Sequence, residues 1–179
     1  MGLDGFIRST EFPRAVADLL TLVLRYLHIV FAVMWIGGVA YAVFVLRTAM
    51  GRVAMPARKE SMRQLVPVAL HYVPMSAALT IILGALLYLV MGSFSVDVLL
   101  GSRWGGILFA SLVLAVATFA FGMVVVIGAA KKVLGHLEEA SCDHGEIVGR
   151  LQRTFNRGQV IILALGLVII ALMISASRV

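Results

Sequence analysis

One histidine stands inside the first long apolar stretch of the chain. His28 belongs to residues 26–46, YLHIVFAVMWIGGVAYAVFVL, which are bounded by Arg25 and Arg47. An apolar helix of this length crosses a bilayer. An ionisable residue near its centre costs about 2.5–3.5 kcal/mol when charged, so it usually faces the bundle interior and has a function. A neutral imidazole in a helix bundle can ligate the iron of haem b or hydrogen-bond a quinone head group.

The residues at helical spacing from His28 strengthen this interpretation. Arg25, His28, Ala32, Trp35 and Val39 share one helix face. Arg25, one turn toward the outer surface, can pair with a haem propionate. We therefore predict a haem b site with His28 as iron ligand and with Arg25 and Trp35 beside it. The alternative left open is a structural histidine that hydrogen-bonds a Ser or Thr of a neighbouring helix.

A second histidine, His71, lies near the start of the next apolar stretch. With the expected span boundaries, His28 and His71 differ in depth by roughly 20 Å at ~1.5 Å per residue, so one haem iron cannot bind both. His71 is either a ligand of a second site at the inner face or an interfacial histidine with a propionate or backbone partner. We favour the second interpretation.

Other groups that bind metals are scattered. His136, Cys142 and His144 lie in a polar segment, but their spacing matches no zinc pattern and favours a solvated loop. Met50, Met55 and Met62 suggest copper(I), which prefers thioethers, but they form no M-x-x-M cluster within a span. The apolar stretches contain no nucleophile–base pair, phosphate loop or carboxylate pair, which argues against hydrolases and kinases.

The composition places the chain among membrane proteins. Of its 179 residues, 61% are hydrophobic and 13% are charged, against about 25% charged in soluble domains. The net charge of +6 comes from loops between apolar stretches and does not indicate nucleic-acid binding.

We predict an all-α, integral membrane four-helix bundle, a single domain over 1–179. The expected spans are about 20–46, 66–91, 105–130 and 158–176. Residues 1–18 should lie at the membrane surface, with Pro13 opening the first helix. Pro74 should kink the second span. Ser76, Thr80, Gly84 and Tyr88 should form a small and polar contact stripe along it.

Cations in the loops predict the orientation. The polar segments 47–64 and 131–157 each hold five Lys or Arg residues (Arg47, Arg52, Arg58, Lys59, Arg63; Lys131, Lys132, Arg150, Arg153, Arg157). The positive-inside rule places both loops in the cytoplasm and both termini outside, in the inner (cytoplasmic) membrane of a cell.

The first span also resembles a known group of proteins. Leu27-His28-Ile29 followed by Trp35-Ile36-Gly37-Gly38 resembles the first helix of HemJ-type protoporphyrinogen oxidases, CopD-type copper-resistance proteins and membrane urate oxidase-like proteins. The likeness is best over residues 24–46. It implies haem b held through His28. The His and Lys of the HemJ type at the start of helix three are absent from Trp104–Leu108.

The expected function is that of a haem b-binding, cytochrome-like membrane redox protein, or a subunit of a membrane redox complex with quinone or other redox subunits as partners. If the protein is an enzyme, it is a membrane oxidoreductase. The alternatives are a non-catalytic accessory subunit and a CopD-like copper transport protein.

Overall fold

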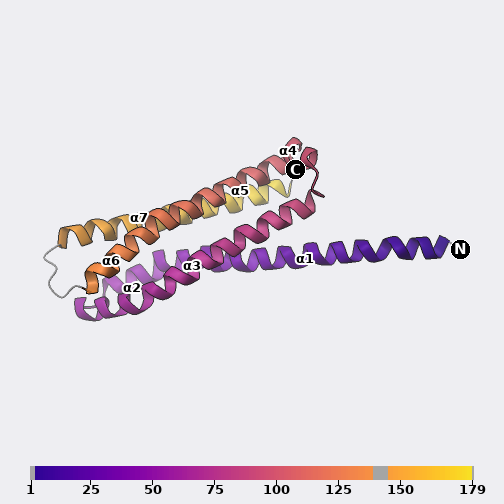
Figure 1. Ribbon diagram of the computed structural model, residues 1–179. Helices are drawn as coiled ribbons and strands as arrows, with labels where there is room; N and C mark the ends of the chain where they lie inside the picture. The colour runs from indigo at the N-terminus through magenta and orange to yellow at the C-terminus, as the bar shows by residue number, and fades with distance from the viewer. Residues whose placement is uncertain (1–2, 139–144, 179) are drawn as a thin grey trace.

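Four long helical segments run side by side and confirm the all-α membrane bundle (Figure 1). A computed structural model describes residues 3–138 and 145–178 of the chain. Within these residues every regular element is helical. Four segments are long and apolar enough to cross a membrane: Val16–Gly51, Met55–Met91, Arg103–Gly135 and Gly149–Ala176. Each is longer than the predicted span because the helices continue beyond the apolar part of the sequence.

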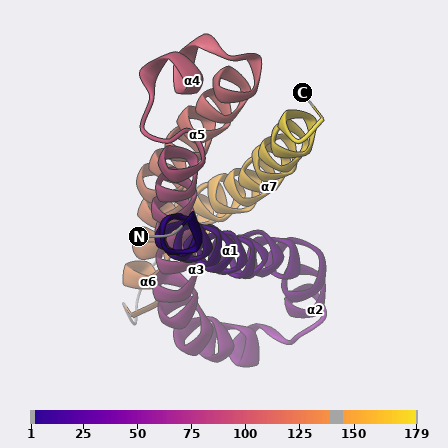
Figure 2. The ribbon, with the colours of Figure 1, turned by 90° about the vertical axis from the view of Figure 1, so that its right-hand side faces the viewer.

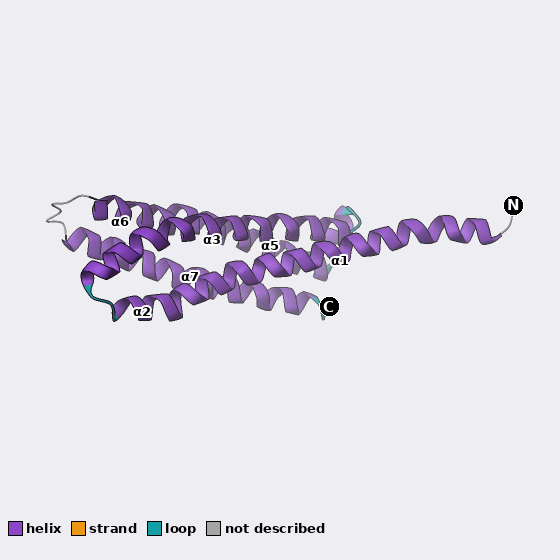
Figure 3. Ribbon diagram, turned by 90° about the horizontal axis from the view of Figure 1, so that it is seen from below, coloured by secondary structure: helices purple, strands orange, loops and turns teal. Residues whose placement is uncertain are grey.

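The first segment combines three elements, α1 (Leu3–Tyr41), the π-helical turn η1 (Ala42–Leu46) and α2 (Arg47–Gly51). The helix already begins at Leu3, so the prediction that Pro13 opens it is wrong. A proline inside a helix removes one hydrogen bond but does not always end the helix. The first turns of α1 extend beyond the rest of the bundle (Figure 3).

The second segment, α3 (Met55–Met91), starts before the apolar stretch. The basic residues 58–63 are therefore helical, and the break between α2 and α3 is confined to residues 52–54. Pro56 occupies the first turn, where its missing N–H costs nothing. Pro67 and Pro74 lie inside the helix, and Pro74 leaves the carbonyl of Leu70 without its usual intrahelical donor.

The other two long segments follow a short helix, α4 (Val96–Gly101). The third consists of α5 (Arg103–Phe121), the π-helical turn η2 (Gly122–Ile127) and α6 (Gly128–Glu138). The fourth is α7 (Gly145–Ala176).

The predicted polar stripe of α3 faces the interior. Ser76, Thr80 and Tyr88 are buried, as are Ser111 and Thr118 on α5. The Ser and Thr hydroxyls donate to carbonyls one turn back on their own helices, for example Thr80 Oγ1 to Ser76 O at 2.8 Å. Short polar side chains of this kind form their hydrogen bonds within their own helix and let neighbouring helices approach closely.

Helix α4 covers the end of the bundle where α3 ends and α5 begins. The hydroxyl of Tyr88 donates to the carbonyl of Leu99 at 2.6 Å, which ties α3 to α4. The ring of Tyr88 lies 6.1 Å from that of Trp104 between centroids. The turn before α4 places Ser93 and Phe94 at φ of 51° and 55°, a left-handed conformation that costs non-glycine residues free energy.

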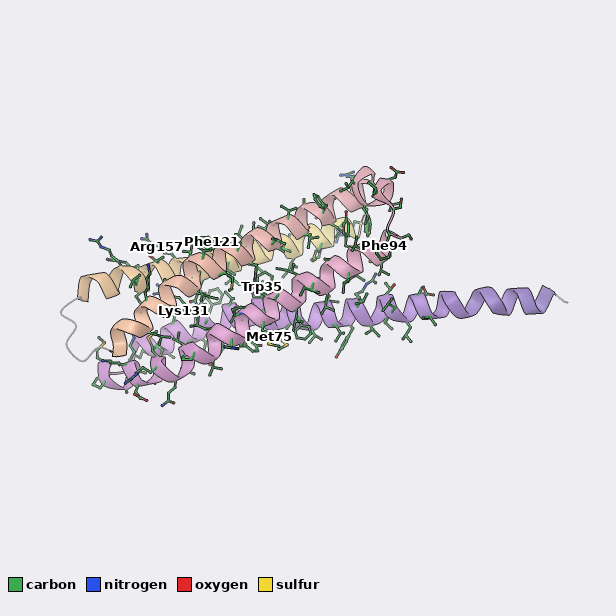
Figure 4. The ribbon with its side chains drawn as sticks, in the orientation of Figure 1. Trp35, Met75, Phe94, Phe121, Lys131 and Arg157 are labelled. Carbon is green, nitrogen blue, oxygen red and sulfur yellow. The ribbon has the colours of Figure 1, made fainter. Side chains whose placement is uncertain are left out.

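The two basic segments lie at the opposite end. α2, α6 and the starts of α3 and α7 gather there, whereas α4 and the C-terminus lie at the other end (Figure 1). Lys131 and Arg157 both belong to this basic end (Figure 4). The arrangement therefore concentrates the cations at one end of the bundle, as four antiparallel spans require.

Candidate functional site

His28 joins α1 to α3. Its side chain is 8% exposed, and its Nδ1 lies 2.8 Å from the carbonyl oxygen of Thr80. Because a carbonyl only accepts hydrogen bonds, Nδ1 carries the proton and donates it, and the neutral ring keeps its lone pair at Nε2. Gly84 provides the space for the ring, since a Cβ at that position would lie 2.7 Å from His28 Cε1. His28 thus links α1 to α3 through a hydrogen bond, and its other ring nitrogen, Nε2, remains a hydrogen-bond acceptor.

The other residues predicted for the haem site lie apart from His28. Trp35 is buried in the core with Val39, Ala77, Val126, Ile162 and Leu163, and it lies inside the bundle in Figure 4. Arg25 is exposed, and its Nη2 lies 3.6 Å from the Sδ of Met91. The predicted helix face is therefore buried at His28, Trp35 and Val39, half-buried at Ala32 and exposed at Arg25.

The side chain of His71 is exposed on α3 and points away from the bundle core. Its neighbour Tyr72 meets α1 at Gly38, where a Cβ would lie 3.2 Å from Tyr72 Cε1. The distance along α1 from His28 to Gly38 is about 15 Å at 1.5 Å per residue. The structure does not bring His28 and His71 together.

A large cavity occupies the half of the bundle toward the basic end. It measures about 390 Å³ and is walled by the first segment, α3, η2 and α7. The α1–α2 and α3 helices are widely separated there and are joined by the turn at 52–54 (Figure 2). Val39, Ala77, Val126 and Ile162 belong both to the cavity wall and to the core layer of Trp35. This layer forms the floor of the cavity, and His28 lies beyond it.

Helix irregularities surround this cavity on three sides. Residues of η1, residues of η2 and Pro74 of α3 all line it. A π-helical turn inserts one extra residue into the helix and is often found at functional sites. Nothing in the sequence pattern of residues 42–46 or 122–127 indicated these turns.

Polar side chains enter the cavity from α7 and from the basic end. Gln152, Asn156 and Gln159 line it from one face of α7, and Gln152 Nε2 donates to Asn156 Oδ1 at 3.3 Å. Arg47 and Arg58 line it from α2 and α3. The lining includes no Asp or Glu among the described residues. This row of three amide side chains on α7 was not predicted, although its spacing of four and three residues is visible in the sequence.

Three methionine side chains also line this cavity. Met50, Met62 and Met123 line it from three different segments, while Met55 is 75% exposed and does not. The sequence showed no methionine cluster because these three are distant along the chain.

The remaining predicted metal ligands are not tested. Cys142, His144 and the side chain of His136 lie outside the described part of the structure. Within the described part, no three His, Cys, Asp or Glu residues gather closely enough to hold a metal ion.

Comparisons with known proteins leave the family open. Neither the known protein families, nor the curated proteins, nor the solved structures contain a match to this chain. The likeness of residues 24–46 to the HemJ and CopD group stays a prediction.

Proposed function

We propose that this chain is a non-catalytic membrane protein that binds an amphiphilic small molecule in the cavity at its basic end. The observation that supports this function is the cavity itself, with a volume of about 390 Å³, mainly apolar walls and the amide row of α7. Pockets for small molecules typically have volumes of ~300–1,000 Å³, with apolar walls and a few polar groups that orient the ligand.

The surrounding helices support a binding role for this space. Interior packing in proteins normally leaves few voids larger than a water molecule. Gln152 and Asn156 are half-buried and satisfy only part of each other's hydrogen-bonding capacity. A ligand with an apolar tail and a polar head can contact both the apolar wall and these amides.

The test is photolabelling with an uncharged long-chain alcohol that carries a diazirine, on protein in phosphatidylcholine nanodiscs. We expect labelled peptides that contain Met62 and Met123 of the cavity wall. Ala42→Phe and Ala69→Phe, two substitutions in the cavity lining, should reduce this labelling several-fold. Ala120→Phe, at an exposed position outside the lining, should not.

Labelling of the lipid-facing surface provides the internal reference. Ile174 is 54% exposed on α7, and its labelling by the probe should be the same in all variants. The proposed function is wrong if cavity peptides are labelled no more than this surface and do not respond to Ala42→Phe or Ala69→Phe.

A second function, haem b binding at His28 within a membrane redox complex, is supported by one specific observation. The Nδ1–H bond to the Thr80 carbonyl is the arrangement that orients a ligating histidine and leaves Nε2 for a metal. When bound, haem supplies one-electron redox chemistry, and this chain would hold it through His28. Arg25, Trp35 and His71 remain predicted neighbours only.

A reduced-minus-oxidised spectrum with a pyridine haemochrome assay tests this second function. A b-type signal that His28→Ala abolishes and His71→Ala retains supports ligation by His28. A colourless protein contradicts it. Metal analysis of colourless protein then tests copper(I) bound by Met50, Met62 and Met123.

We further propose that the protein resides in the inner (cytoplasmic) membrane, with segments 47–64 and 131–157 in the cytoplasm. The cations gathered at one end of the bundle support this orientation. Labelling of single cysteines introduced at Arg52 and Ser177 of a Cys142→Ser variant, in intact and in opened cells, tests it.

A further inference from the structure

Two arginines line the cavity at its basic end, which we call its entrance. Arg47 begins α2 and Arg58 lies in the first turns of α3, so they border the cavity from either side of the turn at 52–54. Among the described residues, neither guanidinium has an ion pair or hydrogen bond. Unpaired guanidinium groups bind carboxylates and phosphates through two parallel hydrogen bonds.

The charge around the entrance is positive. Arg52, Lys59 and Arg63 are close in sequence, and the nearby carboxylate is that of Glu60. Glu60 accepts a hydrogen bond from Gln64 Nε2 at 2.9 Å and does not line the cavity. Within the described part of the chain, an anionic group at the entrance therefore meets two cations that have no ion pair, and no carboxylate in the lining.

The depth of the cavity suits an acyl chain. Val39 lies at its floor and Arg47 at its entrance, a distance of about 12 Å at 1.5 Å per residue. Between them the walls are mostly apolar, with Val66, Val73 and Ile162 as examples. A volume of about 390 Å³ is near the lower limit for ligand pockets and favours one chain over two.

We propose that the cavity binds a single-chain amphiphile with an acidic head group, whose acyl chain lies on the Val39–Ala77 floor and whose head group pairs with Arg47 and Arg58. This inference rests on the proposed function and adds the class of ligand. The Gln152–Asn156–Gln159 row then contacts the polar part of the ligand below its charged group.

The experiment compares two diazirine probes of equal chain length, a fatty acid and the corresponding alcohol, in phosphatidylcholine nanodiscs at pH 8. We expect the acid to label the cavity about tenfold more efficiently than the alcohol. Arg47→Gln/Arg58→Gln should reduce this preference to near one. Arg47→Lys/Arg58→Lys, which keeps the charge, should retain most of it and shows that the entrance still folds.

A charge-matched control separates a specific site from general attraction to the basic end. Arg52→Gln/Arg63→Gln removes two cations outside the cavity lining and should leave the preference unchanged. An equal loss in this variant, or a preserved preference in Arg47→Gln/Arg58→Gln, overturns the inference. Competition by unlabelled lysophosphatidate and by oleate then shows whether phosphate or carboxylate binds more tightly.

The outcomes distinguish the two proposals. Equal cavity labelling by acid and alcohol leaves the proposed function in place and refutes the acidic head group. Failure of both probes to label the cavity refutes both.

Discussion

Substitution of Gly84 by alanine tests the contact between His28 and α3. The added Cβ would lie 2.7 Å from Cε1 and 3.0 Å from Nδ1 of the imidazole. The ring is held in place by its hydrogen bond to Thr80 O at 2.8 Å, so either this bond breaks or α1 moves away from α3.

The expected magnitude follows from three opposing terms. Alanine gains about 0.8–1 kcal/mol over glycine in helix propensity. Overpacking costs about 1–3 kcal/mol, and loss of a polar contact between membrane helices about 0.6 kcal/mol. The overpacking and hydrogen-bond terms exceed the propensity gain, so we expect Gly84→Ala to lower the free energy of unfolding by about 0.6–2.8 kcal/mol.

Gly37→Ala is the matched control, because a Cβ at Gly37 meets nothing within 4 Å. It should be neutral or stabilising by up to about 1 kcal/mol. In a His28→Ala background the ring is absent, and Gly84→Ala should then behave like Gly37→Ala.

The assay is the free energy of unfolding in mixed detergent micelles, followed by circular dichroism, for all members of this double-mutant cycle. The reasoning is refuted if Gly84→Ala is as harmless as Gly37→Ala in the wild-type background. It is also refuted if Gly84→Ala is equally destabilising with and without His28.

Three further predictions concern contacts elsewhere in the bundle. Tyr88→Phe removes the hydrogen bond to Leu99 O and should lower the free energy of unfolding by about 0.5–1.5 kcal/mol, measured by the same assay; an unchanged value would show that α4 does not depend on this bond. Ser111→Ala should change stability by less than about 0.5 kcal/mol, because its hydroxyl donates only to its own helix; a large loss would contradict this. Gly166→Ala should reduce the melting temperature, because its Cβ would overlap Ile36, and Ile36→Val should restore part of the loss; no restoration would place the clash elsewhere.

Helical periodicity predicted most of the inward-facing residues of the first two spans, although Arg25 on the same face is exposed. His28, Trp35 and Val39 are buried, as are Ser76, Thr80 and Tyr88 of the second span. Apolar, small and weakly polar residues recur every three or four positions in these spans, and burial follows the same period. Even the alternative role of His28 as a structural histidine was close to the observed geometry, although its partner is the backbone of Thr80 and not a hydroxyl.

The cavity was beyond the reach of such reasoning. Its wall combines four segments, two π-helical turns and a helix that contains Pro74. π-helical turns have no strong sequence signal, and the gathering of Met50, Met62 and Met123 depends on tertiary packing. The helix start at Met55 was missed for a different reason: hydropathy marks the edge of the apolar region, whereas a helix can continue into water.

The pairing of α1 with α3 has a consequence for biogenesis. His28 contacts Thr80 and Gly84, and Tyr72 donates to Met34 O at 3.5 Å, so these contacts need only the first two spans. Once Met91 has left the ribosome, everything required for this hairpin to form beside the translocon is available. The cavity gains its remaining walls only when η2 and α7 have been inserted, so a nascent chain arrested before Gly122 should contain the hydrogen bond of His28 to α3 but not the cavity.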